Sequence, residues 1–539
     1  MDYLKIGKAT EIENIKDRII YRSFEILPGL LSWSSIGALV LLSFIQPFFV
    51  AAFIIAFDLY WIIRITYFYS HLAGAFSIMK KVKKVNWLEK LKELNPHTIT
   101  SEGLKTKSRS DNHSFGVGVN WEEIYHLVVL PFYKEGKEVI RPSIEALYRS
   151  NYPIREKMIV VLASEERAGQ EAQKVAEEIK NEYESRFFKF LTTTHPKDIP
   201  GELAGKGSNT AWAGKKAKEL IDQLNTPYEN IVVSSFDIDT VVPPDYFSRL
   251  TYVYLTAEDR LRASYQPVPL YFNNIWGAPF LSRIAAFSTT FWALLNQERP
   301  NRLKTFSSHS MPFKALVDVD FWKANIVNED NIIFLQCFLR YDGNYRVIPL
   351  YYPVYMDANV GKNFRQTMTN VYKQHRRWGW GVETIPYILF GFLKNKLIPF
   401  RKKIVLSFDY VEGFWSWATN SFIIALFGWL PGFVGGIEFK NSVLALNLPG
   451  ITGWLGNIAV IFLIFSAFFS INLLLLKTKN FKNHKKKQFA WLALQWLFTP
   501  FIMIALVATP ALDAQTRLML GKYMGFWVTP KHRSNPETA

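Results

Sequence analysis

Two aspartates at the end of an apolar run are the first residues of this chain that could do chemistry. Asp237 and Asp239 directly follow the run "NIVVSSF", Asn230 to Phe236. Side chains two positions apart on an extended segment point the same way, so the pair presents two carboxylates on one side. Such hard oxygen ligands suit Mg²⁺ or Mn²⁺ bridging to substrate phosphates. The alternative, a pair of turn or helix-cap acids, is weakened by the strand-like run before them.

The stretch "LPFYKEGKEVI", Leu130 to Ile140, could supply part of a nucleotide pocket. It follows a short apolar run that predicts a strand, and ligands of open α/β sheets bind just beyond strand ends. Pro131 and Tyr133 could form the edge of a base-binding pocket, with Glu135 as a polar contact within it. The segment alone is weak evidence, because many loops between a strand and a helix have this composition.

A glycine-bearing segment, "GELAGKGSNTAWA", begins at Gly201. The phosphate loop of NTPases has four residues between its first glycine and GK[ST]. Here three residues separate Gly201 from Gly205, and a glycine stands where Ser or Thr is required, so that loop is excluded. What remains is a flexible entry to a helix, from which Lys206 and Asn209 could reach a nucleotide.

Two further clusters lie beside apolar segments. "NEDN", which ends at Asn331, opens an apolar helix, and by itself Asp330 is best explained as a helix cap. "KQHRRWGWG", Lys373 to Gly381, crowds two arginines and several rings in front of the next apolar segment. The planar fork of arginine suits phosphate oxygens, and a tryptophan face suits a sugar ring.

The elements that must position these residues alternate between strand and helix. This rhythm predicts a mostly parallel sheet covered on both faces. Its ligands would bind outside the carboxyl ends of the strands, where the candidate residues lie. The expected strands are 126–131, 158–163 and 230–236, and the expected helices are 139–149, 165–186 and 205–224.

The sequence also predicts that the chain is an integral membrane protein. Of its 539 residues 49% are hydrophobic, and they gather in charge-free stretches long enough for spanning helices, which need roughly 20 apolar residues. Pro47 divides the first stretch, which with its continuation to about Thr66 can form two spans. These stretches are 26–57, 413–437, 441–476 and 488–512.

The positive charge is unevenly spread. The net charge is +17, and six lysines fall in each of the segments 79–92 and 477–487. Excess lysine beside a span marks the cytoplasmic side and suits anionic lipid headgroups, so nucleic acid is not needed to explain it. Two aromatic-rich segments, 279–298 and 386–400, suit helices lying in the membrane interface, although the first suits an ordinary core helix equally well. The single cysteine, Cys337, excludes an internal disulfide framework.

Five of these motifs in order resemble the family 2 inverting glycosyltransferases, specifically the membrane-embedded branch with cellulose, chitin and hyaluronan synthases. The motifs are "LPFYKEG", "GKGSN", "DID", "NED" and "QHRRW". The similarity covers about 123–381 and the arrangement of flanking spans. It implies an α/β GT-A domain inserted between transmembrane helices. That domain would use a nucleotide-diphospho-sugar, with a UDP-sugar favoured, and Mg²⁺ or Mn²⁺.

The resemblance also implies roles for single residues. The two aspartates of "DID" would contact the nucleotide and the metal. Asp330 would be the general base, as the last residue of the family's T-E-D pattern, with Asn328 replacing the threonine. Gln374, Arg377 and Trp378, the family's Q-x-x-R-W signature, would hold the pyrophosphate and the acceptor.

Two segments depart from the family's pattern. Where many relatives carry aspartates after the second strand, this chain reads "ASEER", so Glu165 or Glu166 would have to replace them in base recognition. "SSHSMPF", 307–313, differs from the relatives' glycine-rich acceptor floor. The acceptor therefore does not follow from the resemblance.

The expected organisation places the catalytic domain on the cytoplasmic side of the inner cell membrane. The predicted parts are a cytoplasmic segment (1–27), two transmembrane helices (28–67), a basic linker region (68–119), the GT-A domain (120–381), an interfacial helix (382–408), about three transmembrane helices (409–512) and a tail (513–539).

Three functions are compatible with the sequence. The first is a synthase that extends a polysaccharide and threads it through its own spans, and the Q-x-x-R-W motif with spans on both sides favours it. The second transfers a single sugar to a lipid carrier. The third is a membrane protein that only binds sugar nucleotides.

Overall fold

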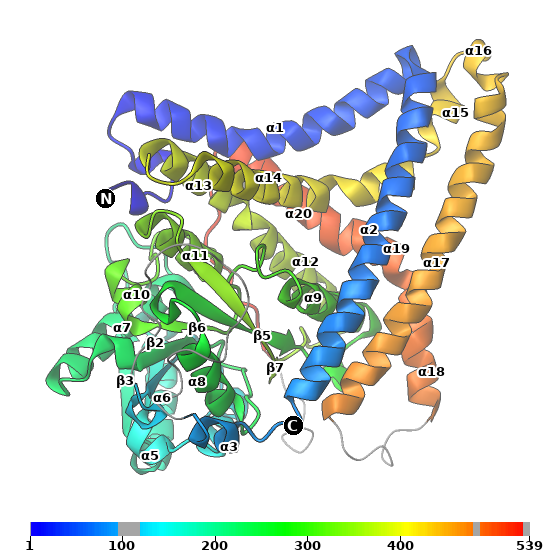
Figure 1. The fold of residues 1–539 in the computed structure, drawn as a ribbon. Helices are drawn as coiled ribbons and strands as arrows, with labels where there is room; N and C mark the ends of the chain where they lie inside the picture. The colour runs from blue at the N-terminus through cyan, green and yellow to red at the C-terminus, as the bar shows by residue number, and fades with distance from the viewer. Residues whose placement is uncertain (1, 95–118, 478–485, 532–539) are drawn as a thin grey trace.

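The computed structural model describes residues 2–94, 119–477 and 486–531. Residues 95–118 of the expected linker region, and most of the second lysine-rich segment, lie outside these residues. A sheet domain and a set of long apolar helices make up the described chain (Figure 1).

One seven-stranded sheet, in the order β3-β2-β1-β4-β6-β5-β7, forms the framework of the domain. Most neighbouring strands run parallel, whereas β6 runs antiparallel to both of its neighbours, β4 and β5. It follows that β4, β5 and β7 point the same way. The strands are β1 (Tyr125–Pro131), β2 (Met158–Glu165), β3 (Lys189–His195), β4 (Ile231–Ser235), β5 (Ala263–Leu270), β6 (His309–Pro312) and β7 (Arg346–Tyr355).

The three strands predicted from the sequence are present, and four more join them. The expected helix after β2 starts later than its pattern indicates, because β2 continues to Glu165 and Gly169, at φ +90°, interrupts the chain before α6. The strands β5 and β7 contain prolines, which remove ladder donors and disguise a strand in sequence. β7 tolerates them at the sheet edge, and the β5–β7 pairing shifts register between Gln266 and Val268.

Helices cover both faces of the sheet, as the alternation predicts. Successive residues of β1 enter opposite cores: Leu127 and Val129 pack in one cluster, and Val128 and Leu130 in the other. The domain helices are α3 (Trp87–Lys92), α4 (Lys137–Tyr148), α5 (Ile154–Lys157), α6 (Gln170–Tyr183), α7 (Lys206–Gln223), α8 (Tyr246–Thr256), α9 (Phe280–Gln297), α10 (Phe313–Asp318), α11 (Glu329–Arg340), α12 (Phe364–Gly379) and α13 (Thr384–Lys394). α9, one of the two segments with an interfacial composition, is mostly buried and packs against β5 and the long helix α2.

The remaining helices include several that are long and apolar. Within the described residues, four helical stretches are long and apolar enough to cross a membrane: Ile15–Ile45, Pro47–Val82, Val443–Leu476 and Lys487–Met519. The chain turns between the first two at Gln46, directly before Pro47. The α-helices outside the sheet domain are α1 (Ile15–Ile45), α2 (Pro47–Val82), α14 (Phe400–Phe422), α15 (Leu430–Val434), α16 (Ile437–Lys440), α17 (Val443–Lys477), α18 (Lys486–Leu494), α19 (Thr499–Ile502) and α20 (Thr509–Met519).

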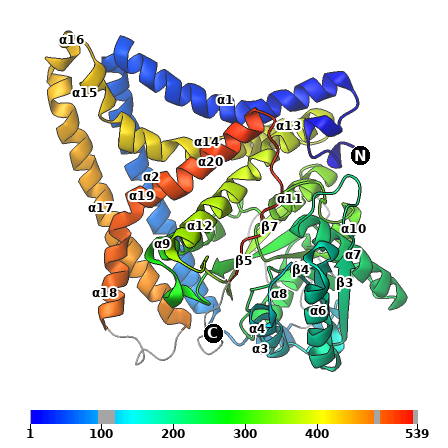
Figure 2. The same cartoon turned by 180° about the vertical axis from the view of Figure 1, so that it is seen from behind.

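Two π-helical turns interrupt this part of the chain, at Ile423–Phe427 after α14 and at Met503–Ala508 before α20. α2 and α17 run side by side, while α1 lies across α13, α14 and α20 (Figures 1 and 2). After α20 the chain turns back to the sheet domain, and this tail, residues 520–531, runs past α11 and β7 (Figure 2).

Candidate active site

The carboxyl ends of β1, β2 and β4 gather the predicted ligand residues at one edge of the sheet. Because these three strands are parallel and adjacent, the segments after them converge there. Pro131 ends β1, Glu165 ends β2, and Asp237 follows β4 by one residue. The structure thus brings these predicted residues together at one edge of the sheet.

Lys206, in the first turn of α7, is the centre of the site. Its ammonium lies 2.8 Å from Asp237 Oδ1 and 2.9 Å from both carboxylate oxygens of Asp330. Glu329 Oε1 is 3.2 Å away. Burial works against the charged ammonium, but the three carboxylates outweigh it and hold the pKa of Lys206 well above its usual range. The lysine thus connects the motif after β4 to the motif that opens α11.

The two aspartates after β4 already carry partners, and Asp239 is buried whereas Asp237 is partly exposed. Asp237 accepts a hydrogen bond from Ser307, and Asp239 Oδ2 accepts one from the backbone N–H of Asp357 at 2.9 Å. Asp239 Oδ1 pairs with Lys531 of the tail. Burial raises the pKa of Asp237, but Lys206 and Lys531 overcome this and lower it. Burial, with Asp357 and Asp237 nearby, leaves the pKa of Asp239 raised.

These residues fit a divalent cation only in combination with other ligands. The Lys531 ammonium stands in for a cation on Asp239, which shows that the carboxylate is oriented toward positive charge. Within residues 2–94, 119–477 and 486–531, no group of three or more His, Cys, Asp or Glu side chains forms a ready-made metal site. A metal here would need phosphate oxygens and waters to complete its coordination.

Asp330 lies in the first turn of α11 and faces the two other motifs. His309 Nδ1 is 3.9 Å from Asp330 Oδ1, and burial lowers the pKa of His309 to about 4, so that imidazole is neutral. Burial and the adjacent Asp330 raise the pKa of Glu329 to about 7. Asp330 is the more exposed of the two acids, which suits it better to meet a substrate.

The Q-x-x-R-W residues lie on α12. Gln374 accepts a hydrogen bond from Asn359 Nδ2 at 3.3 Å, and Trp378 borders the same small cavity. The Arg377 guanidinium lies 4.8 Å from the ring centre of Phe526 in the tail. In the described part of the chain, Arg377 Nε is buried without a hydrogen-bond partner. A buried donor of this kind is costly unless a ligand satisfies it.

The segment after β1 is brought to the same edge. Glu135 accepts hydrogen bonds from the backbone N–H groups of Tyr133 and Lys134, at 2.7 and 3.1 Å. Glu135 also lies near Lys531. Burial lowers the pKa of Lys531, but the charge of Glu135, together with Asp239 and Asp237, keeps it raised. Arg167, which sequence reasoning did not single out, pairs with Glu165 and stacks 4.5 Å from the Tyr133 ring centre. Tyr133 and Arg167 therefore offer flat faces at the end of β2.

Asn209 lies away from the open part of the site. It is buried, and its Nδ2 donates to the carbonyl of Ala163 at 2.8 Å. The amide therefore ties α7 to the end of β2. Glu166, the other acid considered for base recognition, accepts from the backbone N–H of Lys197 at 3.0 Å.

The tail is the principal component of the site that motif spacing did not reveal. A Cβ on Gly205 would lie 2.5 Å from Phe526 Cβ, so only glycine admits the tail this closely. Trp527 lies 5.6 Å from the Lys373 ammonium, and Lys531 reaches Asp239. The signal available in the sequence was the cationic and aromatic composition of "FWVTPK", Phe526 to Lys531.

Glu383 is a second residue that the motifs missed. It is buried just after α12, and Oε1 accepts the backbone N–H groups of Val327 and Asn328 at 3.0 and 2.9 Å. Oε2 accepts Trp380 Nε1 at 2.7 Å. The carboxylate thus fixes the chain immediately before Asp330 to the end of the Q-x-x-R-W helix.

Removing this link is expected to destabilise the protein. Glu383→Ala leaves three buried donors without an acceptor and is expected to cost about 1–3 kcal/mol. Glu383→Gln keeps an acceptor for the two backbone groups but turns a donor toward Trp380, so a smaller loss is expected. Thermal unfolding in detergent measures both. An Ala variant that melts like the wild type would contradict the role.

The mixed sheet domain has the GT-A fold of glycosyltransferases. Residues 232–509, just over half of the chain, match the model of glycosyl transferase family group 2. The chain belongs to this family. The α/β GT-A domain between apolar helices that the sequence predicts is confirmed.

Solved structures give more distant likenesses. The mannosyltransferase PcManGT from Pyrobaculum calidifontis, in complex with GDP-Man and Mn²⁺, is 11% identical, with a TM-score of 0.40 over 87% of this chain and 100% of that one. S. aureus TarS 1–349 in complex with UDP-GlcNAc is 10% identical, with a TM-score of 0.34 over 74% of this chain and 93% of that one. No curated protein matches the sequence significantly. The assignment rests on the family match and the sheet, not on these likenesses.

Proposed function

We propose that this family 2 glycosyltransferase is an inverting enzyme that extends a polysaccharide. It takes a sugar from a nucleotide-diphospho-sugar, with a UDP-sugar favoured, at the cytoplasmic face of the inner cell membrane. The observation that carries the proposal is the Lys206 cluster. One ammonium holds Asp237 and Asp330 at 2.8 and 2.9 Å, so the donor-binding and proton-accepting carboxylates share one site.

The chemistry follows from the residue types. Inversion is a single displacement at the anomeric carbon, so one base must accept the proton of the acceptor hydroxyl, and Asp330 takes that role. Arg377, with its unpartnered Nε, binds the diphosphate as its negative charge develops. A bound Mg²⁺ or Mn²⁺ would be held by Asp237 and Asp239 and would neutralise charge on the leaving group.

The remaining predicted residues complete the two ends of the site. Tyr133 and Arg167, which stack on each other, offer a flat face to the nucleobase, with Pro131 at its edge and Glu135 beneath the loop. Gln374 and Trp378 border a cavity of about 20 Å³ beside Asn359 and Tyr271, which has to widen to admit the acceptor sugar. Lys206 exchanges carboxylate partners for phosphate oxygens as the donor enters.

The membrane helices support a polymer product. The candidate spans lie on both sides of the catalytic domain in sequence, as in the synthase branch that the motifs resemble. We propose that residues 28–67 and 409–512 lie in the membrane, that 382–408 follows its interface, and that the growing chain passes through these helices. A single transfer to a membrane lipid carrier is the alternative, and the size of the product distinguishes the two.

Release of nucleotide diphosphate by detergent-purified protein tests the proposal. The donors are a panel of UDP- and GDP-sugars with Mg²⁺ or Mn²⁺, and the product is sized by gel electrophoresis. Metal-dependent release from one donor with a long product is expected. A product one sugar longer than its lipid acceptor would establish the alternative. Donor binding without any turnover, even with acceptors added, would contradict both.

The tail makes a separate prediction about metal binding. Because the Lys531 ammonium occupies Asp239, a cation must displace it. Lys531→Met is therefore expected to tighten Mn²⁺ binding in the absence of donor by about tenfold, the value of one charged hydrogen bond. Isothermal titration measures it. Lys522→Met, which changes an exposed lysine of the same tail, is the control, and equal affinities in the two variants would contradict competition.

A further inference from the structure

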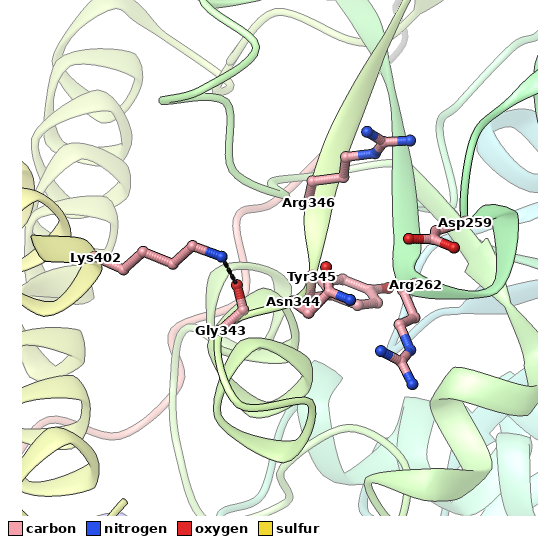
Figure 3. Close-up of a pocket in the computed structure, with 7 residues that line it drawn as sticks. All are labelled: Asp259, Arg262, Gly343, Asn344, Tyr345, Arg346 and Lys402. Carbon is pink, nitrogen blue, oxygen red and sulfur yellow. Dashed lines mark hydrogen bonds between the residues drawn. The ribbon is translucent and has the colours of Figure 1, made fainter. Parts of the chain in front are cut away.

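A second cavity lies at the opposite edge of the sheet from Asp237. It measures about 190 Å³ and opens at the amino ends of β5 and β7, where Ala263 pairs with Arg346 (Figure 3). Because β4, β5 and β7 point the same way, the amino ends of β5 and β7 face away from the donor site. We call this cavity, lined by Asp259, Arg262, Gly343, Asn344, Tyr345, Arg346 and Lys402, the junction pocket.

The junction pocket carries more positive than negative charge. Three of its side chains are cations, Arg262, Arg346 and Lys402, against one acid, Asp259. Arg346 is already paired with Glu258, at 3.5 Å. Within the described residues, Arg262 and Lys402 form no ion pair with a carboxylate. Arg262 instead stacks 5.3 Å from the Tyr341 ring centre, and Lys402 donates to the carbonyl of Gly343 at 3.0 Å.

The walls of the pocket are fixed by a tight turn after α11. Gly343, at φ +82°, donates its N–H to Phe338 O at 2.7 Å, and Asn344 donates to Tyr341 O at 2.8 Å. A Cβ on Gly343 would lie 3.2 Å from Ile398, so the turn packs closely against the chain that enters α14. The two cations are thus held by different parts of the molecule, Arg262 by the sheet domain and Lys402 by α14 (Figure 3).

The start of α14 has the composition of a membrane surface. Lys402 lies between Arg401 and Lys403, and beside them Leu397 and Phe400 are 74% and 75% exposed. Basic residues next to exposed apolar side chains suit the level of lipid headgroups. A pocket at this level meets phosphate groups both from the membrane and from the surrounding solution.

We propose that the junction pocket binds a phosphate ester, with Arg262 and Lys402 as its main partners. The guanidinium fork suits phosphate oxygens, and Lys402 supplies a second charge once the Arg262 side chain, which points away from it, turns toward the pocket (Figure 3). The ester is either a lipid headgroup or a soluble phosphate ester. Bound phosphate would clamp α14 to the sheet domain, and α14 also carries Tyr410, whose hydroxyl donates to Asn331 Oδ1 at 2.7 Å, next to the base Asp330.

The test compares two double variants of equal charge. Arg262→Gln with Lys402→Gln removes two of the three pocket cations, whereas Lys396→Gln with Arg401→Gln removes two exposed cations of the same region outside the pocket. The soluble probe is glycerol phosphate, titrated by calorimetry into full-length protein in a zwitterionic detergent. The lipid probe is phosphatidylglycerol, whose retention is counted by native mass spectrometry after release from nanodiscs also containing phosphatidylcholine.

The expected result is a loss of at least about tenfold in affinity for one probe in the pocket variant, with less than twofold change in the control. Loss of phosphatidylglycerol retention alone identifies a lipid headgroup, and loss of glycerol phosphate binding alone identifies a soluble ester. Equal losses in both variants would show general surface attraction and overturn the proposal. Failure of the wild type to bind either probe would overturn it too. Circular dichroism checks that both variants are folded.

Discussion

Asp330→Asn is expected to lower the rate of sugar transfer by about 10²–10⁴-fold, because asparagine cannot accept the proton of the acceptor hydroxyl. Donor binding should remain, since the asparagine still fits beside Lys206 and leaves Asp237 unchanged. The measurements are initial rates of nucleotide diphosphate release and the affinity for the donor. The variant therefore separates a loss of kcat from a loss of binding.

The matched control is Asp320→Asn, which changes an exposed aspartate of the same domain. Asp320 has φ +59°, a conformation that asparagine also adopts readily, so folding should be unaffected. Activity of the Asp330 variant within threefold of that control would exclude Asp330 as the base. Glu329, also within 3.2 Å of Lys206, would then be the candidate.

Lys206→Met is expected to destabilise the folded protein by about 3–5 kcal/mol, the cost of breaking a buried ion pair from one side. Its removal leaves Asp237, Glu329 and Asp330 close together without their shared cation. Donor binding should be lost as well. Thermal unfolding in detergent measures the first effect, and calorimetry with a nucleotide diphosphate measures the second.

The destabilisation should depend on pH in a definite direction. In the wild type the lowered pKa of Asp237 contributes stability above its unfolded value of about 4, and this is lost as the pH falls through the folded value. The variant lacks that contribution, and its clustered carboxylates favour protonation. The difference between the two proteins should therefore be largest at neutral pH and shrink on acidification.

Lys216→Met provides the control on the same helix. Lys216 is more exposed than Lys206, pairs with Glu219 at 2.8 Å and lies 5.4 Å from the Trp212 ring centre. Such a surface pair contributes little, so its loss should change stability by less than about 1 kcal/mol. Equal melting temperatures for the two variants at all pH values would show that Lys206 does not hold the cluster together.

The position of the site could be predicted because it depends on local patterns. β1, β2 and β4 are apolar and β-branched, and parallel strands bring the segments after them to one edge of a sheet. The motif after β4 indicated Asp237 as a ligand residue, whereas Asp330 was linked to the same candidate site only through the resemblance to the family. The late strands β5 to β7 could not be recognised, because their prolines and irregular register conceal the period of two.

The partners of the site residues depend on contacts distant in sequence. Lys531 lies 292 positions from Asp239, and Glu383 lies 55 positions from Asn328. No spacing rule links such pairs, since they meet only after the helices have packed. Asn209 illustrates the converse: its place in a motif suggested a ligand contact, but packing turns its amide to the carbonyl of Ala163.

Because lysines pair with both aspartates after β4, we expect the metal and the nucleotide to bind together. Asp237 pairs with Lys206 and Asp239 with Lys531, so ammonium groups already occupy the oxygens that would hold a metal. A cation entering alone has to displace these ammonium groups, whereas a diphosphate that arrives with the cation offers them new partners. Initial-rate kinetics should therefore identify the metal–nucleotide complex as the true substrate, with free metal binding weakly and free nucleotide acting as an inhibitor.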